Sequence, residues 1–95
     1  MSQPDLIIHD EKDNVGVVVI ETTKKSQDCS AWIMENDKTI KVPSTNDIPL
    51  GHKIALKDLK VGDTIFKYGH DIGKVVKEIK KGEHVHVHNV KTKKW

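Results

Sequence analysis

The chain has 95 residues, of which 36% are hydrophobic and 32% charged, so it makes one small domain and not two. Its sixteen basic and fourteen acidic residues are mixed along the sequence, and aromatic residues make up only 4%, so we expect no nucleic-acid-binding face. No apolar run approaches the roughly 20 residues of a membrane span, so no contact with a membrane is expected either.

The cysteine content and the first residues bear on the compartment. Cys29 is the single cysteine, which excludes an internal disulfide framework and makes a free thiol the simplest interpretation. Residues 1–6 lack the basic start and the apolar stretch of a signal peptide, so we expect a cytoplasmic protein. A chain of this length buries only about 60–65% of the surface that it exposes when unfolded, so a partner that covers more apolar surface would help it.

Short extended segments alternate with turn-forming residues along the chain. In chain order, the segments that we expect to be strands are 6–9, 15–20, 31–34, 38–42, 52–56, 64–68, 72–76 and 84–88. The second is almost entirely β-branched, which is typical of a strand buried on both faces. The third and fourth are joined by a short polar turn and predict a hairpin. Strands of about five residues with Gly, Pro, Asn or Asp between them predict an all-β domain.

The remaining segments are assigned from their polar composition. Residues 21–30 read as a connection, 57–60 as a single helical turn, and 69–71 as a turn that carries His70 on the surface. The ends, 1–5 and 91–95, are expected to be loose, and we find no internal repeat. The sequence therefore predicts one mainly β domain over residues 1–95, with at most one or two short helical turns.

Three histidines alternate with two valines near the end of the chain. In an extended strand, residues two apart point to the same face, so His84, His86 and His88 would form one row while Val85 and Val87 face the core. Histidine changes charge near neutral pH and is the commonest protein metal ligand, so such a row suggests a site. Histidines on the solvent face of an edge strand are the alternative, because the usual zinc-binding spacings are absent.

Several motifs, found in one order along the chain, carry a resemblance to a known family. They are Asp13-Asn14-Val15, Gly51-His52-Lys53 within 48–56, Tyr68-Gly69 with Ile72-Gly73, and the pattern Val-His-x-His-Asn that ends the stretch from Gly82 to Asn89. The chain resembles the SAF domain that begins the altronate and galactarate dehydratases. It is most similar to the free-standing version of that domain, the small (alpha) subunit of sulfolactate sulfo-lyases. The resemblance covers nearly the whole chain.

The resemblance implies a fold, an activity and a partner. The family fold is the β-clip, a long bent hairpin folded on itself, which agrees with the strand pattern. The implied activity is that of a lyase subunit that works with a large catalytic subunit and is inactive without it. The implied reaction converts (2R)-3-sulfolactate, a small anionic hydroxy acid, to pyruvate and sulfite by metal-assisted β-elimination. Iron(II) (Fe2+) is the implied cofactor, with another divalent metal as the alternative.

The chemistry explains why such a site would use histidines. A proton next to a carboxylate is very weakly acidic, so its removal needs a base and stabilisation of the developing enediolate, which a chelated divalent metal supplies. By motif match we assign His52, His86 and His88 as catalytic residues, and His86 and His88 also as metal ligands. His84 is the third candidate ligand, although the family commonly has a bulky aromatic residue at its position.

Three further residues are assigned as substrate contacts by the same match. Lys53 can pair with a carboxylate or sulfonate as a compact point charge, and Tyr68 and Asn89 can donate hydrogen bonds. Each has a structural alternative: a solvated lysine, a tyrosine that packs with its hydroxyl on the backbone, and an asparagine that ends a strand.

Three other functions stay open at this point. The same domain could serve a dehydratase that acts on altronate or galactarate, which differs only in leaving group and substrate length. A non-catalytic module that binds a ligand or a partner belongs to another class, and the histidine row argues against it. A metal-carrying protein would need tight metal binding by the isolated chain, which a single row of imidazoles supplies poorly.

Overall fold

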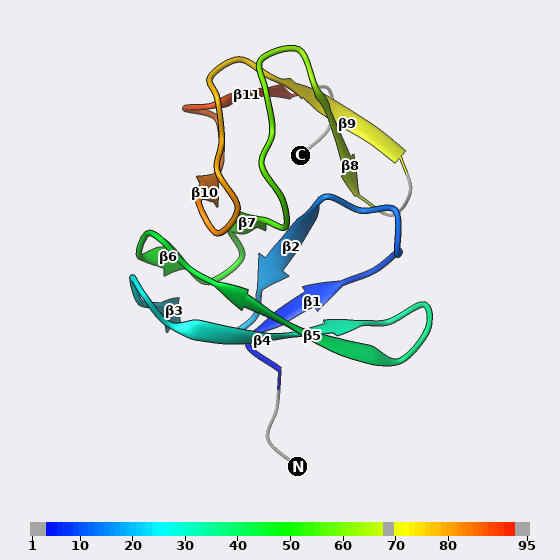
Figure 1. Ribbon diagram of the computed structural model, residues 1–95, viewed down its shortest axis with the longest axis vertical. Helices are drawn as coiled ribbons and strands as arrows, with labels where there is room; N and C mark the ends of the chain where they lie inside the picture. The colour runs from blue at the N-terminus through cyan, green and yellow to red at the C-terminus, as the bar shows by residue number, and fades with distance from the viewer. Residues whose placement is uncertain (1–3, 68–69, 93–95) are drawn as a thin grey trace.

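The computed structural model describes residues 4–67 and 70–92, which form strands joined by turns and contain no helix (Figure 1). The strands are β1 (Leu6–Ile8), β2 (Val15–Val18), β3 (Thr22–Thr23), β4 (Asp28–Ile33), β5 (Lys38–Pro43), β6 (Ile48–Pro49), β7 (Lys53–Ala55), β8 (Thr64–Lys67), β9 (His70–Val75), β10 (His84–Val85) and β11 (Val90–Thr92). The prediction of a mainly β fold is confirmed. No helix long and apolar enough to cross a membrane occurs in the described part of the chain.

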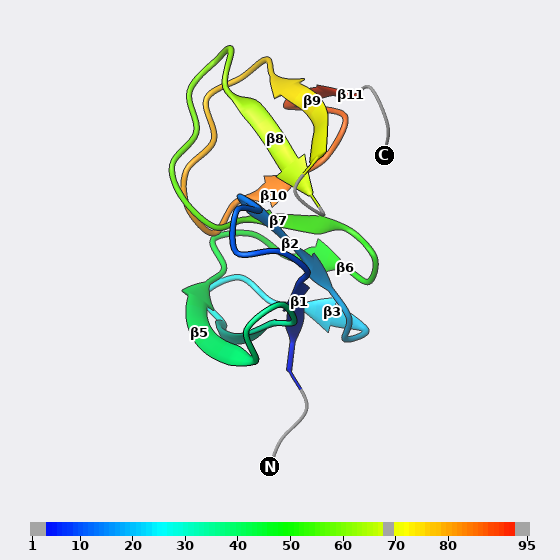
Figure 2. The ribbon, with the colours of Figure 1, turned by 90° about the vertical axis from the view of Figure 1, so that its right-hand side faces the viewer.

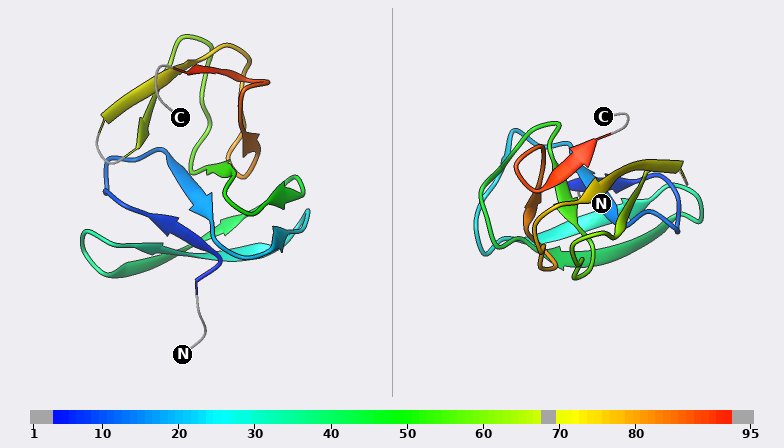
Figure 3. Two further views of the ribbon diagram at one scale, coloured as in Figure 1. Left: turned by 180° about the vertical axis from the view of Figure 1, so that it is seen from behind. Right: turned by 90° about the horizontal axis from the view of Figure 1, so that it is seen from above.

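The strands form three sheets. The largest has the order β10-β7-β2-β1-β4-β5, the second has the order β11-β9-β8, and β3 pairs with β6 in a small third sheet. All strand pairs are antiparallel except β1 with β4. The three-stranded sheet occupies one end of the molecule and the β4–β5 hairpin the other, with β7 and β10 between them (Figures 1 and 2). Views from behind and from above show β9 and β11 side by side (Figure 3).

The apolar side chains fall into two clusters, one for each end. The first lies among β1, β2, β4 and β5, and consists of Leu6, Ile8, Val18, Cys29, Ala31, Ile33, Val42, Ile48 and Ile54. The second lies under the three-stranded sheet, and consists of Val15, Ala55, Leu59, Ile65, Ile72, Val75, Ile79, Val85 and Val90. Strand β4 shows why the sequence folds this way. Its alternate residues Cys29, Ala31 and Ile33 point into the first cluster, as the period of two predicts.

An internal repeat that the sequence analysis missed organises the second cluster. Residues 55–65, Ala-Leu-Lys-Asp-Leu-Lys-Val-Gly-Asp-Thr-Ile, match residues 75–85, Val-Val-Lys-Glu-Ile-Lys-Lys-Gly-Glu-His-Val, at an offset of twenty. The two segments bond reciprocally: the Leu59 amide donates to the Ile79 carbonyl at 2.7 Å, and the Ile79 amide donates back at 2.9 Å. This bridge replaces the helical turn expected at 57–60, which does not form.

The repeat extends to the strands around it. Strands β10, β7 and β2 form one three-stranded unit, which we call the histidine unit, and β8, β9 and β11 form the matching unit. The pairings of the two central strands correspond. Strand β7 pairs with β2 on one side and β10 on the other, and β9 pairs with β11 and β8 in the same way. The Gly82 amide donates to the Ala55 carbonyl at 2.9 Å, and the Gly62 amide to the Val75 carbonyl at 2.8 Å. The two units are therefore related by an approximate two-fold axis.

The strand expected over 84–88 ends after Val85. The next residues, up to Asn89, form a turn in which Val87 is 65% exposed, so the prediction that Val87 faces the core is wrong. Val85, in contrast, is fully buried as expected. The cause is local, because the Asn89 side chain accepts a hydrogen bond from the His86 amide at 3.0 Å. Such side-chain bonds to the backbone compete with strand pairing.

Three smaller assignments also differ from the structure. His70 lies in strand β9 and not in a turn, although it is exposed as expected. The expected connection at 21–30 contains β3 and the start of β4. Lys91 and Thr92, within the end expected to be loose, pair with β9. Residues 69 and 93–95 lie outside the described part of the chain.

Candidate functional site

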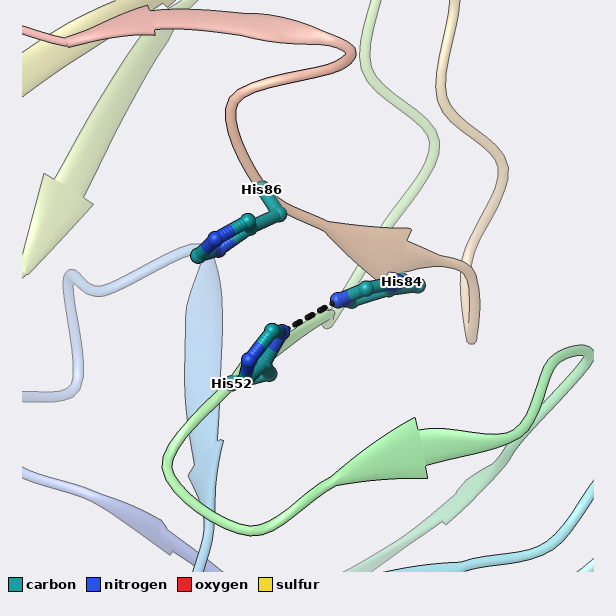
Figure 4. Close-up of side chains that lie close together, drawn as sticks. All are labelled: His52, His84 and His86. Atoms are coloured by element: carbon teal, nitrogen blue, oxygen red, sulfur yellow. Dashed lines mark hydrogen bonds between the residues drawn. The ribbon is translucent and has the colours of Figure 1, made fainter.

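Three histidines from two distant segments lie together beside strands β7 and β10 (Figure 4). His52 lies between β6 and β7, and it follows Gly51, whose φ of 84° is readily adopted only by glycine. The turn is fixed against β2, since the Gly51 amide donates to the Val18 carbonyl and the Val18 amide donates to the His52 carbonyl, each at 2.9 Å. The chain therefore presents the His52 ring at one defined place next to the sheet edge.

His84 and His86 reach the same place from β10 and the turn after it. Because β10 pairs with β7, His84 lies opposite Ile54, and the two side chains lie on the same face of the sheet. His52 precedes Ile54 by two residues, so its side chain uses that face too. Two asparagines hold the local backbone. The Asn46 Oδ1 accepts a hydrogen bond from the His84 amide at 3.1 Å, and Asn89 binds the backbone on both sides of Val85.

The imidazole rings contact one another. The His52 Nδ1 and the His84 Nε2 share a hydrogen bond at 2.8 Å, in which the nitrogen that carries the hydrogen donates. The His52 and His86 rings stack with their centroids 4.2 Å apart, and the His84 and His88 rings lie 5.2 Å apart. His88 is exposed at the edge of this group, whereas the other three are half-buried. We call His52, His84 and His86 the histidine cluster.

Burial and neighbouring charges lower the pKa of two of the clustered histidines. Desolvation, and then the neighbouring His52, lower the pKa of His84 from 6.5 to about 4. Desolvation, His52 and Lys53 also lower the pKa of His86. At neutral pH His84 is therefore an uncharged imidazole, with a lone pair available to accept a proton or to bind a metal.

Lys53, the residue after His52, brings a positive charge that acts on His86. It pairs with Val17 on one side and Val85 on the other, and 4% of its surface is exposed. Desolvation, with a smaller contribution from Lys67, lowers the pKa of Lys53 to about 8. Because about 8 still lies above neutral pH, its amine stays mostly protonated there. A desolvated cation of this kind attracts a small anion more strongly than a solvated lysine does.

The cluster has the donor chemistry of a metal site. One ligand atom of each of His52, His84 and His86 lies within 4.8 Å of the others. Imidazole nitrogens suit zinc, copper, iron and nickel. A ligand nitrogen lies about 2.1 Å from such an ion, so nitrogens that share an ion lie at most about 4.2 Å apart. The spacing of the three nitrogens, up to 4.8 Å, lies close to this limit, so the donor types and their approximate spacing fit a divalent ion.

The structure brings together some of the predicted site residues and not all. His52, His84 and His86 are in the cluster, and His88 contacts only its edge. The sequence ranked His84 below His88 because the family commonly has a bulky aromatic residue at that position. The signal that finds His84 is the pairing of β10 with β7, which lies outside any local pattern.

Tyr68 and Asn89 are the two other residues that were predicted to contact the substrate. Tyr68 lies outside the described residues. Asn89 is buried, its Oδ1 bonded to the His86 amide and its Nδ2 to the His84 carbonyl, which fits the structural alternative of a residue that ends a strand. Its assignment as a substrate contact stays a prediction.

A cleft of about 490 Å³ lies elsewhere on the molecule. Its floor is made by aliphatic side chains, among them Ile8, Ile33 and Ile40, and its rim by Glu11 and Lys12. None of the clustered histidines lines it. We therefore place the candidate site at the histidine cluster, where the groups able to transfer protons or bind metal converge.

The fold agrees with the comparisons to known proteins. The sequence model of the altronate/galactarate dehydratase SAF domain matches residues 4–93. The chain therefore belongs to this family of SAF domains.

Two sulfo-lyase subunits and an altronate dehydratase are similar to this chain. The chain is 50% identical over 91 residues to the (2R)-sulfolactate sulfo-lyase subunit alpha of Chromohalobacter salexigens, a match that covers 96% of this chain and 97% of that protein. It is 49% identical over 63 residues to the subunit of the same name from Paracoccus pantotrophus, covering 66% of this chain and 94% of that one. The altronate dehydratase of Bacillus subtilis is 49% identical over 53 residues, which are 56% of this chain and 11% of that enzyme.

Proposed function

We propose that this chain is the small subunit of a two-subunit carbon–sulfur lyase that converts (2R)-3-sulfolactate to pyruvate and sulfite. The identity of 50% to a sulfo-lyase alpha subunit, over 96% of this chain and 97% of that protein, supports this substrate over a sugar acid. The match to altronate dehydratase is confined to 56% of this chain.

The observation that carries a catalytic role is the contrast between the two units. At the offset of twenty, Thr64, Phe66, Ile72 and Gly73 stand in the matching unit where His84, His86, His52 and Lys53 stand in the histidine unit. The matching unit has the same strand pairing without an imidazole or an ammonium at these places. The fold does not need these groups, and the lowered pKa values of His84 and Lys53 mean that burying those two is unfavourable. Groups of this kind are typical of functional sites.

The chemistry of the substrate fits what the residues offer. A base removes the hydrogen on C2 as a proton, its electron pair forms the C2=C3 double bond, and the C3–S bond breaks so that sulfite leaves with its electron pair. The enol of pyruvate then takes a proton at C3. An imidazole whose lone pair is not bound to the metal can accept the first proton. Lys53 can hold the carboxylate or the sulfonate.

We propose iron(II) as the cofactor, held by His52, His84 and His86. A bound divalent ion would act as a Lewis acid that stabilises the developing enediolate. This ligand set differs from the pair His86 and His88 assigned from the sequence, because His88 lies at the edge of the cluster. Other divalent ions suit the same donors.

We propose that a large catalytic subunit completes the site. The relatives named subunit alpha imply a second subunit in their enzymes. In the altronate dehydratase of Bacillus subtilis the matched region is 11% of the chain, so most of that enzyme lies outside it. Three imidazoles on an open surface also leave room for further ligands and for substrate. In this account the isolated chain is inactive, and it works in the cytoplasm.

The test is a sulfite-release assay on (2R)-3-sulfolactate with iron(II), using this chain co-purified with the large subunit encoded beside it. Sulfite and pyruvate that form only when both chains are present are the expected result. Formation of a keto acid from altronate or galactarate, without sulfite release, would move the activity to the dehydratases. Neither product, with no partner retained, would contradict the lyase proposal and favour a non-catalytic binding module.

A further inference from the structure

Asn89, buried at the end of the turn after β10, binds the backbone of two clustered histidines. Its Oδ1 accepts a hydrogen bond from the His86 amide at 3.0 Å, and its Nδ2 donates to the His84 carbonyl at 2.8 Å. The main chain closes the same turn, because the amides of Asn89 and Val90 both donate to the His86 carbonyl at 3.1 Å. One side chain, 4% exposed, thus fixes the backbone on both sides of Val85.

The matching unit contains the same arrangement, built on Asn14. The Phe66 amide donates to the Asn14 Oδ1 at 2.9 Å, and the Asn14 Nδ2 donates to the Thr64 carbonyl at 2.8 Å. Phe66 and Thr64 stand at the positions equivalent to His86 and His84. Asn14 is also buried, with 6% of its surface exposed. Asn14 and Asn89 are therefore structural equivalents, one of which holds histidines while the other does not.

The main-chain bonds of the two asparagines agree with this equivalence. The Leu56 amide donates to the Asn14 carbonyl and the Val76 amide to the Asn89 carbonyl, each at 2.9 Å. Both asparagines precede a strand that pairs with the centre of its unit, β2 with β7 and β11 with β9. Loss of either side chain therefore removes two equivalent side-chain hydrogen bonds from the fold.

We propose that Asn89 is a positioning residue for the histidine cluster. By fixing the backbone of His84 and His86, it keeps the first ring within hydrogen-bond distance of His52 and the second stacked on it. In this role it acts through the histidines and does not need to touch the substrate. The inference deepens the proposed function, because it takes the cluster as the reacting centre, but the placement of the rings can be measured without turnover.

The experiment compares Asn89→Ala with Asn14→Ala in the full chain. Because each variant loses the same two side-chain bonds, both should lower the thermal unfolding midpoint by similar amounts. Only Asn89→Ala should lose the nuclear Overhauser contacts between the ring protons of His52 and His86. In the assembled enzyme, Asn89→Ala should lower kcat for sulfite release at least tenfold, and Asn14→Ala should leave it near the wild-type value.

Two results would overturn the proposal. Either Asn89→Ala keeps the wild-type contacts between the rings, or Asn14→Ala loses them to the same extent, which would make the effect a general loss of order. Loss of the ring contacts in Asn89→Ala alone, with turnover unchanged, would support positioning and count against the proposed function of the cluster. If an alanine variant does not fold, Asn89→Asp and Asn14→Asp keep the oxygen acceptor, and the former should still lose the contact between His52 and His84.

Discussion

The histidine unit and the matching unit are built on one backbone plan, and they differ in the chemistry of equivalent positions. Both have a central strand paired on two sides, a glycine with positive φ in the turn before the outer strand, and a buried asparagine that binds the outer strand. In the matching unit the equivalent positions hold Thr64, Phe66, Ile72 and Gly73. These residues bring neither an imidazole nor a buried charge.

The comparison separates what the fold requires from what the site adds. The buried positions shared by the units, such as Ile65 and Val85, are both aliphatic and fully buried. The positions that differ hold half-buried rings, of which His84 and His86 have lowered pKa values, together with a buried lysine. Because functional sites are where proteins depart from the choices that maximise stability, the histidine unit is where function is expected.

The largest effects should come from charges at the shared core positions. Val85→Asp and Ile65→Asp each place a carboxylate in a fully buried site, so each should cost about 4 kcal/mol or more and prevent folding. Circular dichroism and thermal unfolding would show this. Val87→Asp is the control, because Val87 is 65% exposed and should tolerate the change. A folded Val85→Asp chain would show that the units do not share a core requirement.

The two turn glycines, Gly62 and Gly82, should differ in how much stability is lost when each is replaced by alanine. Both have positive φ, 94° at Gly62 and 89° at Gly82, so alanine at either position should cost about 1–2 kcal/mol. A Cβ at Gly82 would also lie 2.0 Å from the Pro43 carbonyl oxygen, whereas one at Gly62 meets nothing within 4 Å. Gly82→Ala should therefore lose about 3 kcal/mol in urea unfolding and Gly62→Ala about half of that. Equal losses would show that the Pro43 contact yields easily.

Acid should weaken the histidine unit through His84. Its pKa is 6.5 when unfolded and about 4 when folded, so the unfolded chain binds the proton first as the pH falls. The unfolding free energy should drop between pH 6.5 and 4 and level off below, by about 1–2 kcal/mol after allowance for a half-exposed ring. His84→Thr, which introduces the residue found at position 64, should remove this part of the slope in chelator-treated buffer. Identical slopes would contradict the assignment.

Replacing Lys53 should give the smallest effect, and in the opposite direction. Its pKa falls from 10.5 when unfolded to about 8 when folded, so the penalty grows as the pH falls from 10.5 to 8 and is complete at pH 7. Lys53→Met removes the desolvated charge and should raise the unfolding free energy at pH 7 by about 1 kcal/mol, with a smaller gain at pH 10. A loss of stability at pH 7 would show that the ammonium is needed by the fold.

The sequence predicted the strands well where local alternation decides the structure. In β5 apolar and polar residues alternate and turn-forming residues follow it, whereas the first half of β4 lies in the segment 21–30 that was expected to be a connection. It failed at 86–89, because a side-chain bond from Asn89 turns the chain where the valine–histidine alternation predicts continued extension. The repeat was missed because Asp replaces Glu and Leu replaces Ile between its copies, and because His84 stands against Thr64.

Which histidines form the candidate site could be predicted in part from the sequence, but how they are arranged could not. His52 and His86 could be assigned from their motifs, but the hydrogen bond between His52 and His84 depends on a pairing between segments 32 residues apart. No local pattern reports such a register. The buried state of Lys53 was also out of reach, because it depends on Val17 and Val85 on the two flanking strands.

The most direct test of whether the histidine unit is functional is to replace one of its histidines by the equivalent residue of the matching unit. His86→Phe introduces the side chain found at position 66, and the rate of sulfite release by the assembled enzyme is then compared with that of Phe66→Leu, a change confined to the matching unit. The account predicts that both variants fold, that His86→Phe lowers kcat by about 10²–10⁴-fold, and that Phe66→Leu keeps it. An unchanged rate in a folded His86→Phe enzyme would contradict the claim that the cluster is the reacting centre.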